Sequence, residues 1–201
     1  PAALPSSHVG SSVARSGETT VIGAQAYDDR GAVFVYTAGN DTPVRLQPSG
    51  LQIGDDFGAS VAVSGDRIVV GASNAYDGDG AVYVFQRLAG TWTPQGDPIS
   101  STKDNEGFGT SVAIDVGTIV VGALSSDDDG AAFVFELSAS GWEREDPFLE
   151  NGIGFGQSVA VDGNTIAVGA PRGDSLDGAV YIYRKVNGSW TFDRILTAQT
   201  G

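Results

Sequence analysis

Short apolar segments alternate with glycine-rich polar turns along the whole chain, and no stretch shows a sustained helical period. One repeat of this pattern begins at 60–63 with small and apolar residues. The pair Gly65-Asp66 follows, and then an almost entirely apolar segment at 68–72. A two-residue turn that contains glycine indicates an antiparallel hairpin, and an unbroken apolar strand indicates burial on both faces.

Two further strands complete this repeat. The third, at 80–85, is apolar and rich in β-branched and aromatic residues. The fourth begins with Trp92 and is more polar. Pro94, and Pro147 in the next repeat, suit an edge strand because a missing N–H does no harm there. Polarity therefore rises from the first strand to the fourth, a gradient typical of a propeller blade from its axis to its rim.

Four copies of the repeat follow one another along the chain. Their first strands open with Gly10, Gly58, Gly109 and Gly156, which are 48, 51 and 47 residues apart. A Gly-Ala pair lies thirteen residues after each of these glycines. Because one blade cannot bury two apolar faces alone, neighbouring blades must stack. The sequence thus predicts an all-β fold, a β-propeller with four four-stranded antiparallel blades. We expect one domain over 1–201, with blades near 6–50, 54–104, 105–152 and 153–200.

Three of the copies carry a Phe-Gly pair at the start of the first strand, at Phe57, Phe108 and Phe155. The last Gly-Ala pair continues as Gly169-Ala170-Pro171. As a set, these motifs resemble the FG-GAP repeat family, the blade type of integrin α-subunit propellers, over essentially the whole chain. The first copy has Val9-Gly10 instead, as expected of an atypical terminal blade. Three arrangements stay open: a closed four-bladed ring, a homodimer that forms an eight-bladed ring, and a part of a longer propeller.

Charge and composition limit the partners and activities that we expect of this chain. The chain has 25 acidic and 11 basic residues, a formal net charge of −14. This surface repels phosphate backbones and anionic membranes, so we expect no nucleic-acid partner and no membrane insertion. Cysteine is absent, and His8 is the single histidine. Because the chain has no nucleophile motif and no phosphate-binding motif, we expect that it is not an enzyme.

Acidic residues gather between the second and third strands. The integrin resemblance would place calcium between the first and second strands. Tight turns such as Gly65-Asp66 leave no room there for about six to eight oxygen ligands. The candidate binding residues are Asp28, Asp29, Tyr76, Asp77, Asp79, Asp127, Asp128, Asp129, Arg172, Asp174 and Asp177. These residues are compatible with ordinary turns, with direct contacts to a ligand, or with a calcium site. The metal candidates are Asp77, Asp79, Asp127 and Asp129.

Three shorter features remain. Arg172-Gly173-Asp174 spells the tripeptide that many integrins recognise, although composition makes a chance occurrence unremarkable. Asn40 and Asn187 begin N-glycosylation sequons between third and fourth strands. We expect the three Phe-Gly phenylalanines to fill the core between blades, and the tryptophans of the outer strands to belong to the core rather than to a sugar site.

The function that these observations favour is a non-catalytic extracellular or cell-surface recognition module. It would bind an extracellular protein or a glycan through loops on one propeller face, as the family resemblance implies. One alternative is a lectin that holds sugars between blades or at the acidic loops. Another is a structural spacer in a larger surface protein. Calcium is the one cofactor that the acidic loops suggest.

Overall fold

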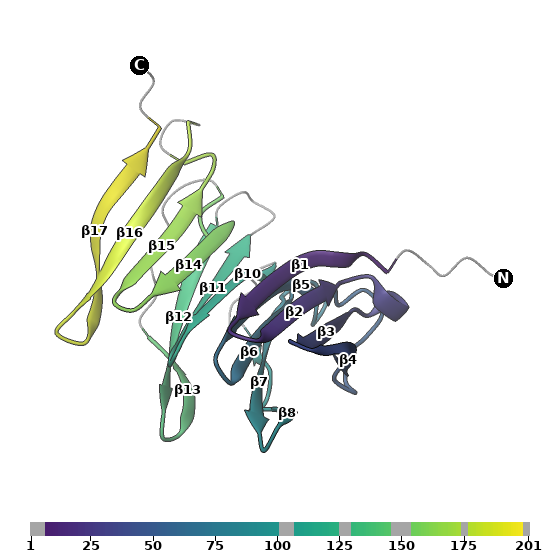
Figure 1. Cartoon of the computed structure of the whole chain (residues 1–201). Helices are drawn as coiled ribbons and strands as arrows, with labels where there is room; N and C mark the ends of the chain where they lie inside the picture. Colours follow the sequence, from purple (N-terminus) through teal and green to yellow (C-terminus); the bar gives the residue numbers. More distant parts are fainter. Residues whose placement is uncertain (1–6, 101–106, 125–129, 146–153, 174–176, 199–201) are drawn as a thin grey trace. The chain divides into compact units, whose positions relative to one another are not determined.

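The computed structural model describes residues 7–100, 107–124, 130–145, 154–173 and 177–198 (Figure 1). The chain divides into two compact units, Pro1–Thr110 and Ser111–Gly201. The strands of the described residues form four antiparallel sheets, each with its first four strands in chain order. The predicted all-β class with four four-stranded blades is therefore confirmed, and the matching of sheets to repeats supports the propeller blade as their unit. Within the described ranges, no helix is long and apolar enough to cross a membrane.

The first compact unit contains two complete sheets. The first sheet consists of β1 (Val9–Ser16), β2 (Thr19–Ala24), β3 (Ala32–Thr37) and β4 (Asn40–Leu46), with a short 3-10 turn η1 (Tyr27–Asp29) between β2 and β3. The second sheet consists of β5 (Phe57–Ser64), β6 (Arg67–Ala72), β7 (Ala81–Leu88) and β8 (Thr91–Pro94). A fifth strand, β9 (Ile99–Ser100), also pairs with β7, so the outer position of this blade is shared by two short strands.

The other two sheets follow the same plan. The third sheet consists of β10 (Phe108–Asp115), β11 (Thr118–Leu124), β12 (Gly130–Ser138) and β13 (Gly141–Arg144). The fourth consists of β14 (Ser158–Asp162), β15 (Thr165–Ala170), β16 (Ala179–Val186) and β17 (Ser189–Thr197). Burial is highest in the inner strands of the sheets: β6 and β11 are almost fully buried, whereas the outer strand β17 is mostly exposed. The first strands β1 and β14 are also largely exposed, so burial does not rise steadily toward the first strand. The predicted edge position of Pro94 is confirmed at the end of β8.

The hairpins between first and second strands are as tight as predicted. Ser64 pairs directly with Arg67, and Gly65 adopts a left-handed φ of +55° between them. In the third blade the same first turn position is taken by Val116, with a φ of +49° and 72% of its surface exposed. A β-branched residue is strained in this region, so the third hairpin stores conformational energy that the glycine hairpins do not.

Successive blades are joined by one recurring contact, which we call the blade junction. In the first compact unit β5 lies against β1 and β2 (Figure 1). The Ser12 hydroxyl donates a hydrogen bond of 2.8 Å to the carbonyl oxygen of Gly58. Gly23 lies so close to the same carbonyl that a β-carbon on it would overlap the oxygen. The junction therefore needs a serine on the first strand and a glycine on the second, facing the Phe-Gly glycine of the next blade.

The same geometry recurs twice. Ser60 donates to the Gly109 carbonyl at 2.7 Å, and Gly71 faces that carbonyl. In the second compact unit, Ser111 donates to the Gly156 carbonyl at 2.8 Å, and Gly122 faces it. The phenylalanines that precede the three carbonyl-bearing glycines are fully buried, at 0%, 1% and 0% exposure for Phe57, Phe108 and Phe155. Their predicted role as core residues between blades is confirmed.

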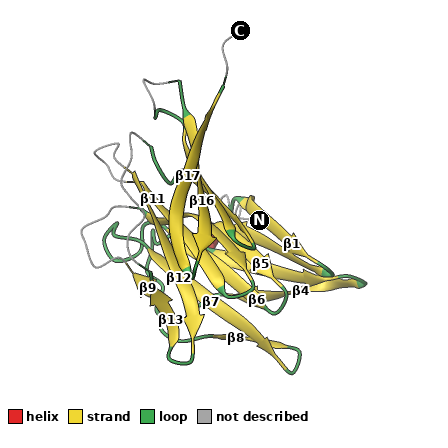
Figure 2. Cartoon of the chain, turned by 90° about the vertical axis from the view of Figure 1, so that its left-hand side faces the viewer, coloured by secondary structure: helices red, strands yellow, loops and turns green. Residues whose placement is uncertain are grey.

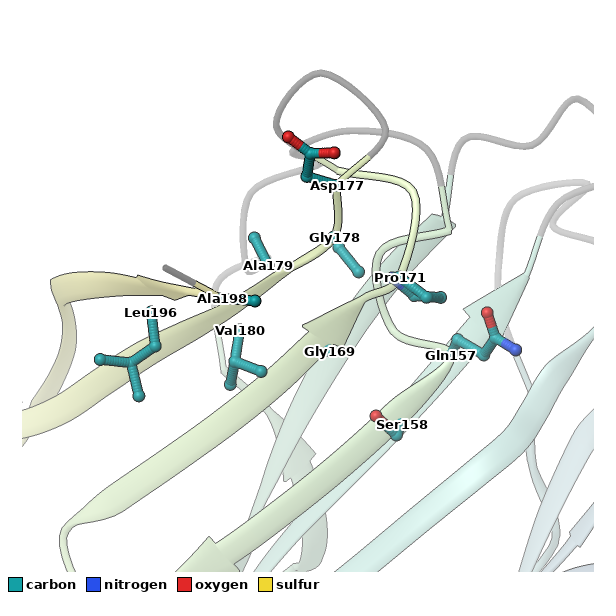
Figure 3. A pocket seen from close by; sticks show the side chains of 11 residues that line it. Gln157, Ser158, Gly169, Pro171, Asp177, Gly178, Ala179, Val180, Leu196 and Ala198 are labelled. Carbon is teal, nitrogen blue, oxygen red and sulfur yellow. The ribbon is translucent and has the colours of Figure 1, made fainter. Parts of the chain in front are cut away.

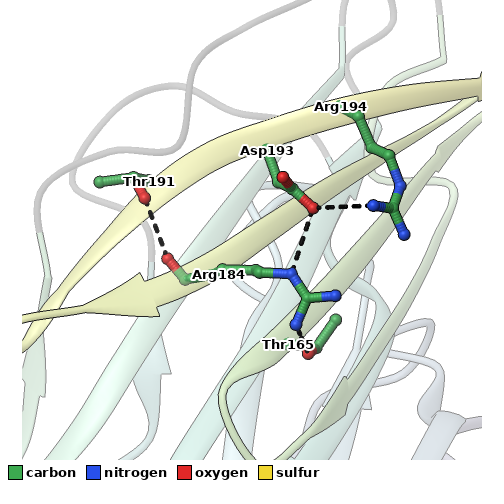
Figure 4. A network of polar contacts seen from close by, with 5 residues as sticks. All are labelled: Thr165, Arg184, Thr191, Asp193 and Arg194. Carbon is green, nitrogen blue, oxygen red and sulfur yellow. Dashed lines mark hydrogen bonds and ion pairs between the residues drawn. The ribbon is translucent and has the colours of Figure 1, made fainter.

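Polar contacts fix the outer strand of the fourth blade. Figure 2 shows the long β16–β17 hairpin, in which the pairing shifts between Ile182 and Tyr183. Asp193 lies at this irregularity and accepts from Arg184 at 3.1 Å and from Arg194 at 3.3 Å (Figure 4). Arg184 also reaches the Thr165 hydroxyl of β15 at 3.4 Å. Because these side chains are partly exposed, we expect the network to orient the strand more than to stabilise it.

Candidate functional site

The loops between second and third strands adopt strained backbone conformations in both blades of the first compact unit. Asp28 and Asp29 have φ values of +51° and +60°, and Tyr76 and Asp77 have values of +56° and +62°. A consecutive pair of non-glycine residues in the left-handed region is energetically costly and is often found at functional sites. All four side chains are exposed.

The backbone of these loops also holds the next blade in place. The Asp29 carbonyl accepts from the Gly54 N–H at 2.7 Å, and the Arg30 carbonyl accepts from the Phe57 N–H at 3.0 Å. In the second blade, the Asp79 carbonyl accepts from the Phe108 N–H at 3.1 Å. The acidic loops therefore have a structural role. Ordinary structural turns were one of the three interpretations that the sequence allowed.

The other candidate residues are only partly described. Arg172 and Asp177 are exposed on the loop between β15 and β16, and Gly173 is buried in a turn closed by its N–H to the Ala170 carbonyl at 2.9 Å. Asp174 and the acidic run Asp127, Asp128 and Asp129 lie outside the described residues. An integrin-binding role of Arg172-Gly173-Asp174 stays a prediction.

The candidate metal ligands are also only partly described. Where the structure describes the chain, it brings no three histidine or carboxylate side chains into a group that could hold a metal ion. Asp77 and Asp79 therefore do not make a site on their own, and the predicted calcium site would need the residues at 127 and 129. Calcium binding stays a prediction.

A pocket lies beside Tyr76, within the first compact unit. Its volume is about 330 Å³. The connection from β4 to β5 and the break between β8 and β9 form its walls, with Tyr76 and Tyr83 from the second blade. The lining residues are Pro48, Ser49, Gly50, Gln52, Asp55, Tyr76, Tyr83, Pro94, Gly96 and Pro98. We call this site the Tyr76 pocket.

A buried carboxyl group and a half-buried phenol define the chemistry of the Tyr76 pocket. Asp55 is 7% exposed, and its carboxylate accepts from the Gln52 N–H at 2.7 Å. Burial, together with the neighbouring Tyr76 and Asp55, raises the pKa of Tyr83 to about 12. Tyr83 is therefore a neutral phenol at physiological pH, and it is braced edge-on against Phe57 with ring centres 5.2 Å apart. The pocket thus combines aromatic and proline surface with a carboxylate and a phenol.

Sequence reasoning identified Tyr76 but missed the rest of this pocket. Pro48 and Asp55 lie in the connection from β4 to β5, and Pro98 lies in the break between β8 and β9, so none of the three belongs to the repeated motifs. The signal that could have found them is the grouping of Pro48, Pro94 and Pro98 around the second copy alone.

Trp92 and Trp190 lie against charged side chains, whereas the buried indole N–H of Trp142 has no hydrogen-bond partner among the described residues. Trp92 is 9% exposed, and the Arg87 guanidinium lies 5.2 Å from its ring centre. The Trp190 indole N–H donates to Glu136 at 3.0 Å, and Lys185 pairs with the same carboxylate at 2.8 Å. The preference for a core role is thus confirmed for Trp92, and Trp190 is half-buried in a polar cluster.

The two sequons lie where the sequence predicted them. Asn40 is exposed at the start of β4, and its side-chain oxygen accepts from the Thr42 N–H at 2.9 Å. Asn187 is exposed in the β16–β17 hairpin, with a φ of +52°. Both are accessible acceptor sites, and their use stays a prediction.

Comparison with known proteins agrees with the repeat analysis. The model of the FG-GAP repeat matches residues 43–85, 100–135 and 150–183, which together are more than half of the chain. The matches begin after the first Val9-Gly10 pair, where the Phe-Gly signature is missing. No curated protein matches the chain.

Proposed function

Because the chain belongs to the FG-GAP repeat family, we propose that it is a non-catalytic recognition module that binds a protein or glycan partner through the Tyr76 pocket and the loops beside it. Repeats of this family build β-propellers and are typical of extracellular proteins. We therefore propose an extracellular or cell-surface location.

The observation that carries the proposal is the composition of the Tyr76 pocket. An exposed tyrosine in a strained backbone conformation lines the pocket together with a buried carboxylate and a neutral phenol. Aromatic faces stack on sugar rings and on cationic side chains, and the two polar groups can hydrogen-bond to hydroxyl or amino groups. With a net charge of −14 on the chain, a neutral hydroxyl-rich or a basic partner fits this surface best.

A structural spacer is the second candidate function, and one observation favours it. The Asp29 and Asp79 carbonyls hold the next blade, so the sequence of these loops is partly explained without any ligand. A spacer would not need an exposed tyrosine at this pocket, because the junction hydrogen bonds described above come from backbone groups of other residues.

The test is a glycan array, followed by a search for protein partners on cell surfaces. The whole chain is applied once in calcium and once in EDTA. Tyr76→Ala should weaken binding at least tenfold, because it removes the stacking surface of the pocket. Tyr27→Ala is the matched control, since Tyr27 lies in the equivalent loop of the first blade and packs edge-on against Phe34 instead.

Each outcome decides between the candidates. Binding to a sugar class that Tyr76→Ala abolishes and Tyr27→Ala preserves supports a lectin-like recognition module. Protein binding with the same mutational pattern supports adhesion. If EDTA alone removes binding, the acidic loops hold calcium. If the chain binds neither glycans nor cell surfaces, the recognition proposal is wrong and the spacer remains.

A further inference from the structure

The Tyr76 pocket contains a buried carboxylate that forms no ion pair within the described part of the chain. Asp55 lines the pocket and is 7% exposed. The ion pairs among the described residues belong to other carboxylates, those of Asp66, Glu136 and Asp193. Buried carboxylates in proteins are normally paired with a cation. The pocket is therefore suited to a cation that a ligand brings.

One oxygen of the Asp55 carboxylate is fixed by a turn and the other faces the pocket. Oδ2 accepts from the Gln52 N–H at 2.7 Å, and the Asp55 N–H donates back to the Gln52 carbonyl at 3.3 Å. Oδ1 has no hydrogen bond among the described residues, yet it is not fully enclosed. Because Asp55 lines the pocket, a well-held turn presents one free carboxylate oxygen to a ligand.

The charge of Asp55 also acts on the groups around it. Burial raises the pKa of both Asp56 and Tyr83, and the charge of Asp55 raises each of them further. At Asp56 the Asn74 side-chain amide, which donates to this carboxylate at 2.7 Å, and the neighbouring His8 oppose part of the effect. The surroundings of Asp55 therefore do not cancel its negative charge, and this charge attracts a cation into the pocket.

The walls of the Tyr76 pocket favour an organic cation over a metal ion. Besides Asp55, the lining includes the side chains of Tyr76, Tyr83 and three prolines. One carboxylate among aromatic and proline surface does not supply the about six to eight oxygen ligands that calcium takes. The same surface suits an alkyl chain, and aromatic faces attract its charged end. A volume of about 330 Å³ is at the lower end for ligand pockets, so it accommodates a single side chain.

The cavity over the fourth blade lacks this combination. Its volume is about 600 Å³, and Figure 3 shows its lining. Its one charged lining residue, Asp177, is exposed and stands at the loop end of the cavity (Figure 3). No aromatic side chain lines it among the described residues. The larger cavity thus offers neither a buried carboxylate nor a ring, and the Tyr76 pocket is the better cation site.

We propose that the Tyr76 pocket binds a lysine side chain of a protein partner, an inference that rests on the recognition function proposed above. The ammonium group donates to Asp55 Oδ1 and to the phenol oxygen of Tyr83, and the aliphatic stem lies along Tyr76. Lysine suits the site better than arginine. A guanidinium gains most from a carboxylate with two free oxygens, and Gln52 already engages Oδ2. A neutral sugar would leave the charge of Asp55 without a counterion.

NMR titration of the whole chain with a short blocked peptide, which carries one lysine between glycines, tests this proposal. We expect saturable shifts at the backbone amides of the pocket, among them those of Gln52 and Tyr76. The same peptide with an ε-acetylated lysine should give no such shifts, because acetylation removes the charge. An arginine peptide should bind about threefold more weakly, since its fork cannot use both carboxylate oxygens freely.

Two variants of the chain test the proposed contacts. Asp55→Asn should weaken binding of the lysine peptide more than tenfold, because a hydrogen bond to a charged acceptor is lost. Asparagine keeps an oxygen for the Gln52 N–H, so the turn can still form. Tyr83→Phe should weaken binding about threefold to tenfold, since it removes one neutral acceptor and keeps the ring that packs on Phe57. Glu18→Gln is the matched control, the same loss of charge at an exposed position outside the pocket.

The outcomes separate this inference from the proposed function. The lysine inference is wrong if the lysine and acetyl-lysine peptides bind alike, if the arginine peptide binds as tightly, or if Asp55→Asn binds like the unchanged chain. If the lysine peptide does not bind but a glycan does, and Tyr76→Ala abolishes that binding, the recognition function stands and only the lysine inference fails. If peptides, glycans and cell surfaces all fail to bind, both are wrong.

Discussion

The blade junction makes a quantitative prediction for Gly71, the glycine of β6 that faces the third blade's first strand. In Gly71→Ala, the new β-carbon would overlap the backbone carbonyl oxygen of Gly109 as well as the Ser60 hydroxyl. A hydroxyl can rotate away, but a backbone carbonyl moves only with its strand. The start of β10 must therefore shift, and with it Phe108 and the Ser60 hydrogen bond.

The size of the effect follows from what the shift disrupts. A buried hydrogen bond of 2.7 Å is lost, which costs about 1–1.5 kcal/mol. Phe108, at 1% exposure, loses part of its packing, and partial loss of a buried phenylalanine adds about 2 kcal/mol. The lower entropy of unfolded alanine offsets about 0.5 kcal/mol. We expect Gly71→Ala to lower the free energy of unfolding by about 3 kcal/mol.

Gly169→Ala is the matched control, because Gly169 has the same place in the second strand of the fourth blade. Among the described residues, the nearest atoms to its new methyl group belong to Ser158 of its own sheet, and the closest is a hydroxyl that can rotate away. Gly169→Ala should lower the free energy of unfolding by less than about 1 kcal/mol. Urea unfolding followed by tryptophan fluorescence measures both variants. Equal losses for the two glycines would refute the reasoning, since both would then reflect strand propensity alone.

Three further predictions concern single sites. Val116→Gly should raise the free energy of unfolding by about 1 kcal/mol in thermal or urea unfolding, because it relieves a φ of +49° at an exposed position. Glu136→Ala should lower it by about 1–3 kcal/mol, because Trp190 and Lys185 lose a shared acceptor, and salt should reduce the difference. Burial raises the pKa of Tyr83 from 10.0 to about 12, so its contribution to stability is complete below pH 10 and is lost as the pH rises toward 12. Tyr83→Phe should flatten that alkaline decline in a pH series of unfolding curves, and an unchanged decline would assign it to other groups.

The sequence alone was sufficient for the architecture, because the repeat encodes it redundantly. Four copies of glycine, apolar strand and hairpin turn predicted four antiparallel sheets, and the tight turn at Gly65 was identified from two residues. Periodicity is a one-dimensional signal, however. It marked Ser60 and Gly71 as repeated positions. It did not show that both lie against the Gly109 carbonyl, which is 49 residues from Ser60 and 38 residues from Gly71.

The Tyr76 pocket was less accessible to sequence reasoning for a related reason. Its walls come from the irregular segments between and within repeats, where no second copy provides a comparison. Asp55 and Pro98 contribute through the path of the backbone, which composition does not reveal. For the acidic loops, the sequence could name the residues but could not separate the carbonyls that hold the next blade from the carboxylates that stay exposed.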